Sequence, residues 1–145
     1  MEHLVFVFGT LKEGFPNFSV NQGTRIPGEF RTCVAYPLYL VGERHSPWLI
    51  EAPHTGLRVA GQVFRVDSQT LAAMDKLERV TELDGYRRKL LQLEDVDSSN
   101  LVSAYAYLKS PEQLASPEVR VGPIGEYLHA HAALYRARGP QKPVH

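Results

Sequence analysis

Two acidic side chains near the end of a predicted helix could perform acid–base chemistry. Residues 69–79 carry apolar side chains at helical spacing, Leu71 and Met74 among them. Glu78 follows Met74 by four residues and Asp75 by three, so it lies on or beside the core-facing side, with Asp75 as a neighbour. A carboxylate among apolar side chains retains a proton more readily, and it can serve as base and acid near neutral pH. The alternative is a boundary glutamate whose head reaches water.

A glycine-bearing turn after the first apolar segment could bind an anionic oxygen. Residues 4–8 are β-branched and aromatic, which predicts a buried strand. Gly9, Gly14 and Pro16-Asn17 prevent the following residues from forming a helix. Backbone N–H groups at such a turn can hold a carboxylate or a polarised carbonyl oxygen. A phosphate-binding loop is rejected because Phe15-Pro16 stand where that motif needs Lys and Ser or Thr. An ordinary first strand and tight turn is the other interpretation.

Other residue patterns give no support for a metal, a reactive thiol or nucleic-acid binding. His129 and His131 are two residues apart on a predicted helix, so they face different directions and make a poor metal pair. Cys33 has no local sign of activation. The 16 basic and 16 acidic residues cancel and are interspersed, which argues against phosphate-backbone binding. We therefore expect no metal, no cofactor and no nucleic-acid partner.

Length and composition indicate one globular domain. The 145 residues are 43% apolar and 22% charged, which is ordinary for a soluble protein. We expect a single domain over residues 1–138 and a flexible tail over 139–145. The lone cysteine fits a reducing compartment, and the five-residue apolar run after residue 3 is not a signal peptide. No apolar run approaches the about 20 residues of a membrane span. We therefore expect a cytoplasmic protein that does not bind membranes, and the sequence does not determine its oligomeric state.

The elements that must position these residues are short strands with few helices. Strands are predicted over residues 4–8, 29–35, 38–41, 46–50 and 57–66, and a hairpin over 86–108. The acidic pair lies on a helix over 69–79 that Asp67-Ser68 would cap. A second helix is predicted from Pro123, with one face formed by Ile124, Tyr127, Leu128, His131 and Tyr135. Because strands and helices do not alternate strictly, we expect an α+β fold with a mixed, partly closed sheet of about six strands.

Residues 5–12 read Val-Phe-Val-Phe-Gly-Thr-Leu-Lys, and Gly14 and Pro16-Asn17 follow them. This segment resembles the N-terminal signature of the gamma-glutamyl cyclotransferase-like superfamily, and most closely that of its gamma-glutamylamine cyclotransferase branch. Residues 71–78, ending in Met-Asp-Lys-Leu-Glu, are similar to its Leu-Asp-x-x-Glu helix, and Tyr86-Arg87-Arg88 matches its Tyr-x-Arg element. The likeness covers residues 4–108 in consistent order.

This resemblance implies a fold and a role for particular residues. The implied fold is a mixed, partly closed β-barrel with flanking helices. Glu78 would be the catalytic acid/base, and Asp75 and Arg88 would support it. The implied substrate-binding residues are Phe8, Gly9, Thr10, Leu11, Tyr36, Tyr86 and Tyr107. The family usually has a tyrosine where this chain has Phe8, and the stretch from Glu78 to Tyr86 looks longer than in close relatives.

The implied reaction is an intramolecular aminolysis that needs no cofactor. The α-amine of a small gamma-glutamylamine attacks its own γ-carbonyl, giving 5-oxoproline and a free amine. Two alternatives are kept. The substrate could be a gamma-glutamyl amino acid or a specialised gamma-glutamyl metabolite, or the chain could be a non-catalytic metabolite-binding module. An acid on an otherwise apolar face argues against the binding module, because burying it there is costly.

Overall fold

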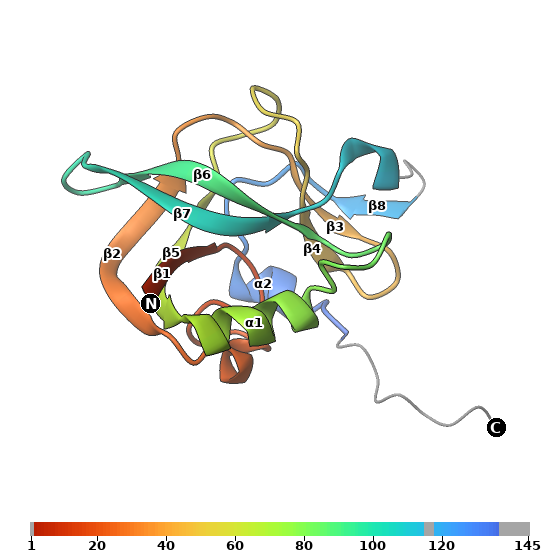
Figure 1. Cartoon of the computed structure of the whole chain (residues 1–145). Helices are drawn as coiled ribbons and strands as arrows, with labels where there is room; N and C mark the ends of the chain where they lie inside the picture. The colour runs from red at the N-terminus through yellow and green to blue at the C-terminus, as the bar shows by residue number, and fades with distance from the viewer. Residues whose placement is uncertain (1, 115–117, 137–145) are drawn as a thin grey trace.

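The computed structural model of the chain describes residues 2–114 and 118–136 (Figure 1). The strands are β1 (Glu2–Val7), β2 (Thr24–Thr32), β3 (Leu38–Val41), β4 (Ser46–Leu49), β5 (Ala60–Asp67), β6 (Arg87–Asp95), β7 (Leu101–Leu108) and β8 (Val119–Val121). The helices are α1 (Ser68–Leu77) and α2 (His129–Ala132), with 3₁₀ turns at Phe18–Val20 and Pro111–Gln113. Among the described residues, none of these helices has the length and apolar character that crossing a bilayer requires.

Five strands form a closed barrel in the order β1-β5-β2-β6-β7, and β4-β3-β8 form a separate sheet. The barrel is mixed, because β1 pairs in parallel with β7 at Val5 and Tyr105 while its other pairs are antiparallel. The expected α+β class is confirmed, as is the hairpin, whose register runs from Arg87↔Leu108 to Glu94↔Leu101. The strand count differs from the expectation because β3 and β4 leave the barrel and pair with β8, a strand of three residues that was not predicted.

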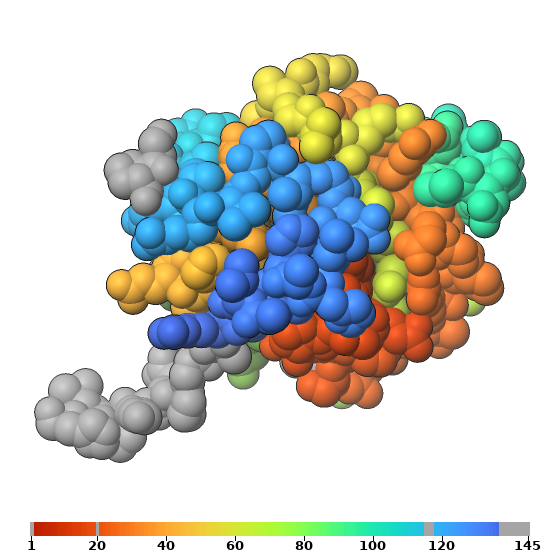
Figure 2. Space-filling view, turned by 180° about the vertical axis from the view of Figure 1, so that it is seen from behind, coloured from red at the N-terminus to blue at the C-terminus, as the bar shows by residue number. Residues whose placement is uncertain are grey.

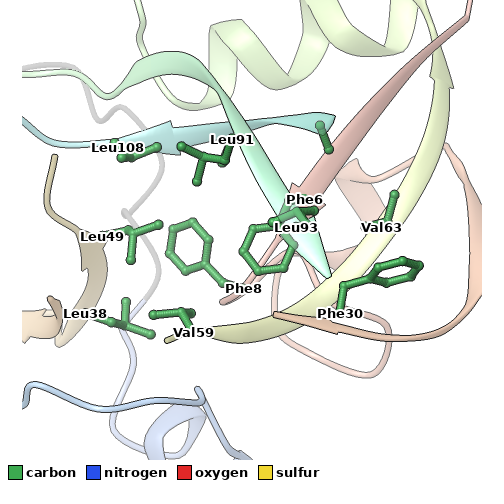
Figure 3. Packing of buried hydrophobic residues seen from close by; sticks show 12 residues of the cluster. Phe6, Phe8, Phe30, Leu38, Leu49, Val59, Val63, Leu91, Leu93 and Leu108 are labelled. Carbon is green, nitrogen blue, oxygen red and sulfur yellow. The ribbon is translucent and has the colours of Figure 1, made fainter. Parts of the chain in front are cut away.

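Strand β1 is buried on both faces, which explains its continuous apolar sequence. Phe6 and Phe8 point into the barrel, where they join the core cluster shown in Figure 3. Val5 and Val7 point to the opposite face and pack in a second cluster with Met74 of α1. Strand side chains alternate between faces, so each face of the strand packs in a different cluster.

Helix α1 begins and ends with standard capping interactions. The Asp67 carboxylate accepts a hydrogen bond from the N–H of Thr70 at 2.7 Å, and this bond lowers the pKa of Asp67. At the other end Arg79 adopts a left-handed conformation with φ of 56°. Its N–H and that of Val80 donate to the carbonyls of Lys76 and Asp75, each at 3.2 Å, which is a Schellman motif. The helix therefore ends at Leu77, two residues earlier than predicted, and Glu78 is its C-cap.

Two predicted strand boundaries were wrong because of local irregularities. The strand expected over residues 29–35 begins at Thr24 and continues through Pro27-Gly28, where a register shift and a φ of 105° at Gly28 mark a bulge. The strand expected over residues 57–66 begins only at Ala60. Leu57 instead forms an isolated bridge with Tyr36.

The second helix was predicted wrongly, and only one turn of it, His129–Ala132, is present. Upstream of this turn the backbone bonds to strands rather than to itself. The N–H of Ile124 donates to Leu38 at 2.9 Å, and the carbonyl of Gly125 accepts from Ala60 at 2.8 Å. Ile124 also packs on the barrel core. These non-local bonds satisfy the backbone groups that a helix would otherwise pair internally. The tail expected over residues 139–145 lies outside the described residues.

The C-terminal segment packs against the loop that follows β1. Figure 2 shows this segment crossing the back of the molecule beside the N-terminal residues. The Lys12 Nζ donates to the carbonyl of Tyr127 at 2.5 Å, and the rings of Phe15 and His129 stack with centroids 4.2 Å apart. Burial lowers the pKa of Lys12. The last described part of the chain thus supports the turn at the end of the first strand.

We expect Gly61→Ala to destabilise the barrel, because a Cβ there would lie 2.5 Å from the carbonyl oxygen of Val7 and 2.7 Å from the ring of Phe6. Overpacking of this kind costs about 1–3 kcal/mol, which lowers the melting temperature by roughly 3–10 °C. Gly125→Ala is the matched control, since its Cβ would meet nothing closer than 3.4 Å. Thermal unfolding of both variants tests this, and equal melting temperatures would contradict the tight packing at Gly61.

Candidate active site

An open cavity of about 1100 Å³ lies where the ends of β1, α1 and β7 meet the β3–β4 turn. Its lining contains Phe8, Gly9, Thr10 and Leu11 from the turn after β1. The other predicted site residues that line the cavity are Glu78, Tyr86 and Tyr107. The structure therefore brings together seven of the predicted site residues, which lie up to about 100 positions apart in the sequence.

Hydrogen bonds to its carbonyl groups hold the turn after β1. The carbonyl of Gly9 accepts from the N–H of Lys12 at 3.1 Å, and that of Thr10 accepts from the N–H of Asn17 at 2.8 Å. The side-chain amide of Asn17 also donates to the Thr10 hydroxyl at 2.9 Å. The N–H groups of Gly9, Thr10 and Leu11 donate to no acceptor within residues 2–114 and 118–136. They are suited to hold an oxygen of a bound molecule.

Glycine at position 9 is required by the close approach of the second sheet. A Cβ on Gly9 would lie 2.8 Å from Cγ of Pro47 in β4. The backbone of the turn can therefore lie directly against Pro47, which also lines the cavity. Trp48, the next residue of β4, also lines the cavity.

Glu78 is half-buried at the C-cap of α1 and lines the cavity. Its N–H donates to the carbonyl of Met74 at 2.9 Å, and its own carbonyl accepts from the N–H of Tyr86 at 2.9 Å. The second bond closes the loop of residues 79–85. A Cβ on Gly85 would lie 1.7 Å from the carbonyl oxygen of Arg79, so only glycine fits this closure. The backbone on both sides of Glu78 is thereby fixed.

Asp75 and Arg88 lie behind Tyr107 and do not line the cavity. One carboxylate oxygen of Asp75 is 2.5 Å from Nη1 of Arg88, and the other accepts from the Tyr107 hydroxyl at 2.7 Å. Burial, together with this hydrogen bond to Asp75, raises the pKa of Tyr107, so the phenol remains a protonated donor. This arrangement is suited to orient Tyr107 at the cavity wall.

Tyr36 is not among the residues that line this cavity, and its expected role in substrate binding stays a prediction. Its backbone forms a bridge with Leu57, and its ring packs against the barrel core. Burial, with a smaller contribution from Glu51, raises its pKa.

Several residues that line the cavity were not predicted from the sequence, foremost among them Lys109 and Tyr135. Lys109 is only 4% exposed, and its Nζ lies 4.4 Å from the ring centroid of Trp48 and 4.5 Å from that of Tyr86. The Tyr135 hydroxyl accepts from Asn17 at 3.2 Å and from Arg44 at 3.3 Å. No pattern in the sequence distinguishes these residues, because their neighbours in space come from distant segments.

The described residues contain no cluster of three or more His, Cys, Asp or Glu side chains that could hold a metal ion. His129 and His131, which the sequence analysis judged a poor metal pair, each contact a different group. His129 stacks on Phe15, and Nδ1 of His131 accepts from the N–H of Leu128 at 2.9 Å.

The barrel, the adjoining sheet and the cavity define an AIG2-like fold. The structure is similar to the crystal structure of an AIG2-like protein from Mus musculus, with a TM-score of 0.81 and 26% sequence identity over 98% of this chain and 99% of that one. An NMR structure of a protein named A2LD1 is similar at a TM-score of 0.65 and 30% identity, covering 79% of this chain and 81% of that one.

Sequence comparison gives the family. The model of the family described as gamma-glutamyl cyclotransferase, AIG2-like, matches residues 5–128, and the chain belongs to this family. It is 37% identical over 125 residues to gamma-glutamylaminecyclotransferase B of Danio rerio, covering 79% of this chain and 64% of the relative. It is 40% identical over 96 residues to gamma-glutamylaminecyclotransferase of Homo sapiens, covering 63% of this chain and 61% of the relative. The chain thus spans less than two thirds of the length of these two relatives.

The raised pKa of Tyr107 predicts how the stability of the protein depends on alkaline pH. Above about pH 10 an unfolded tyrosine loses its proton while buried Tyr107 retains it, so the free energy of unfolding falls as the pH rises. One such group contributes at most about 1.4 kcal/mol per pH unit. We expect Tyr107→Phe to unfold with a shallower pH dependence between pH 10 and 11 in denaturant titrations. Equal slopes for wild type and variant would contradict the protonated, buried phenol.

Proposed function

We propose that the protein is a gamma-glutamylamine cyclotransferase that releases 5-oxoproline and a free amine. The observation that carries the proposal is that Glu78 and residues Gly9, Thr10 and Leu11, whose N–H groups donate to no acceptor in the described part of the chain, line one cavity. An acid/base and an oxyanion-binding turn are what an intramolecular aminolysis needs. The names of the relatives from Danio rerio and Homo sapiens support the same activity.

The substrate contributes both reacting groups, so the protein has to fold the glutamyl arm and move protons. In the proposed reaction the neutral α-amine of the substrate attacks its γ-carbonyl carbon while the carboxylate of Glu78 takes one proton from the attacking nitrogen. A carbon–nitrogen bond forms and closes a five-membered ring. Because nucleophile and electrophile belong to one molecule, correct folding of the arm supplies the proximity.

The Gly9–Leu11 turn acts on the oxygen that becomes negative during the attack. Its backbone N–H groups donate to the γ-oxygen as the tetrahedral intermediate forms. Protonated Glu78 then returns a proton to the departing nitrogen, the old amide bond breaks, and the carbonyl of the lactam forms. Phe8 and Tyr107 form the walls of the site, and Asp75 with Arg88 hold Tyr107 in place.

We also propose that the protein acts in the cytoplasm. Cys33 is a free thiol and is the only cysteine of the chain, which suits a reducing compartment. Balanced and interspersed charges suit a small-molecule partner better than nucleic acid.

The direct test is incubation of the purified protein with a panel of gamma-glutamylamines and gamma-glutamyl amino acids, with 5-oxoproline detected by mass spectrometry. We expect 5-oxoproline to form from the amines. Its formation from the amino acids alone would reassign the substrate class, and its absence with every compound would reject the cyclotransferase.

Replacing Glu78 by Gln should abolish turnover while leaving the fold intact. Loss of a general acid/base lowers kcat by about a hundredfold or more. Glu82→Gln is the matched control, because this exposed glutamate lies four residues further along and does not line the cavity. Turnover and thermal unfolding are measured on the same samples. A folded Glu78→Gln protein with near-normal turnover would remove Glu78 from the mechanism.

The oxyanion role of the turn predicts different outcomes for two substitutions of Thr10. Thr10→Ala removes the hydroxyl that Asn17 contacts but keeps the backbone N–H, so activity should fall only modestly. Thr10→Pro removes the N–H and fixes φ, so kcat/KM should fall by about a hundredfold or more. Steady-state kinetics of both folded variants provide the test, and equal losses would place the oxyanion site elsewhere.

A further inference from the structure

Arg44 is a cation of the β3–β4 turn whose position is fixed by the C-terminal segment. The N–H of Arg136 donates to the carbonyl of Arg44 at 2.9 Å, and Nε of Arg44 donates to the carbonyl of Arg136 at 3.0 Å. Nη2 of Arg44 donates to the Tyr135 hydroxyl at 3.3 Å, and the guanidinium carbon lies 5.8 Å from the centroid of the Tyr135 ring. These contacts hold the guanidinium at one place in the wall of the cavity, which Arg44 and Tyr135 both line.

The Arg44 guanidinium keeps N–H groups that none of its contacts uses. A guanidinium has five N–H groups, and the bonds to Tyr135 and Arg136 take one on Nε and one on Nη2. Both acceptors are neutral, and no carboxylate of residues 2–114 and 118–136 forms an ion pair with Arg44. Glu43 and Glu118 also line the cavity, but both are exposed. The remaining N–H groups of Arg44 can therefore bind an anion that enters the cavity.

The Tyr135 hydroxyl is a second donor at the same place. Its oxygen accepts from Nδ2 of Asn17 at 3.2 Å and from Nη2 of Arg44 at 3.3 Å. A phenol has one O–H donor besides its acceptor sites, so these two bonds leave the O–H directed away from both partners. Within the described part of the chain this O–H donates to no acceptor. Because its oxygen accepts from a cation, the O–H is polarised and donates more strongly. It is suited to share a carboxylate with Arg44.

The Arg44–Tyr135 pair lies beside the turn that is proposed to bind the oxyanion. Nδ2 of Asn17 donates both to the Tyr135 hydroxyl and to the Thr10 hydroxyl, the latter at 2.9 Å. Since one amide nitrogen reaches both oxygens, the Tyr135 hydroxyl lies next to the Thr10 side chain. The N–H of Asn17 also donates to the carbonyl of Thr10 at 2.8 Å. A substrate whose γ-oxygen is held at this turn therefore has another of its groups within reach of Arg44 and Tyr135.

We propose that Arg44 and the Tyr135 hydroxyl together bind a carboxylate of the substrate and so determine which gamma-glutamyl compounds the cavity accepts. The inference rests on the proposed function and deepens it by naming a specificity-determining pair. In the proposed chemistry Glu78 and the turn act on the amine and the γ-oxygen, so a carboxylate needs donors of its own. This carboxylate has two sources, the α-carbon of the glutamyl arm and the leaving amine. Guanidinium N–H groups and the phenol O–H donate to its oxygens and orient the substrate without taking part in bond making or breaking.

The test compares three substrates that differ in their carboxylates. Gamma-glutamylbutylamine has only the α-carboxylate, 4-aminobutanoyl butylamide has none and would cyclise to 2-pyrrolidinone, and the gamma-glutamyl amide of 5-aminopentanoate has one on each part. Wild type should prefer the first over the second, or the third over the first, by at least about tenfold in kcat/KM. In Arg44→Met the preference should fall by at least about tenfold, mainly through KM, and in Tyr135→Phe by about fivefold. The preference that falls identifies the source of the carboxylate.

Each variant has a matched control. Arg79 also lines the cavity and is partly exposed, but it pairs with Asp84 at 3.1 Å, so Arg79→Met should keep the wild-type preferences. The Tyr127 hydroxyl is buried, has no hydrogen-bond partner among the described residues and does not line the cavity, so Tyr127→Phe should keep them too. A loss of preference in Arg79→Met as large as in Arg44→Met would show a general effect of positive charge in the cavity and would overturn the assignment.

The outcomes separate this inference from the proposed function. If Arg44→Met and Tyr135→Phe lower kcat/KM for all three substrates equally, the pair only braces Asn17 and the turn, and the inference is wrong. If wild type forms 5-oxoproline but shows neither preference, the inference is wrong while the proposed function stands. If wild type forms a lactam from none of these substrates and none of the gamma-glutamyl panel, the proposed function and the inference fail together.

Discussion

The first strand is buried on both faces and paired on both edges, and the position of the site follows from this constraint. Phe6 and Phe8 occupy the barrel interior, while Val5 and Val7 pack beneath α1. A slip of one residue would exchange these two sets, so the register of β1 between β5 and β7 is strongly determined. The turn that begins at Gly9 therefore leaves the barrel at a fixed point, where Gly9, Thr10 and Leu11 line the cavity.

Charged groups around the site are buried only where other groups compensate them. Asp75 has Arg88 and the Tyr107 hydroxyl, Lys109 has the carbonyl of Asp84 and two rings, and Lys12 has the carbonyl of Tyr127. Each contact also ties one segment to another that is distant in the sequence. Compensation of this kind holds side chains in a single arrangement before substrate binds, which is the condition for electrostatic stabilisation of a transition state.

The C-terminal part of the described chain completes the cavity wall and braces the turn. The Tyr135 hydroxyl accepts from Asn17, whose amide also contacts Thr10, and from Arg44 of the β3–β4 turn. The N–H of Arg136 donates to the carbonyl of Arg44 at 2.9 Å. These bonds connect the end of the chain to both sides of the site. The cavity is therefore assembled from the first and the last described segments, with α1 and β7 between them.

The sequence by itself determined the features that depend on local patterns. The apolar run and glycine turn of residues 4–9, the hairpin of 86–108 and the helix that ends beside Glu78 were predicted because alternation, helical spacing and capping residues act over a few positions. The resemblance to the family then indicated which of these elements carry the chemistry. Phe8, Tyr86 and Tyr107 were placed at the cavity in this way.

Only the tertiary structure decided which distant segments meet. Tyr36 forms a bridge with Leu57 and does not line the cavity, and bonds from Ile124 and Gly125 to other segments replaced most of the predicted second helix. Lys109 looks in sequence like any lysine after a strand, and its burial between Trp48 and Tyr86 exists only because β7 lies beside β4. The physical reason is the same in each case, since backbone pairing and burial between segments far apart in the chain outweigh the weak preferences of a short stretch of residues.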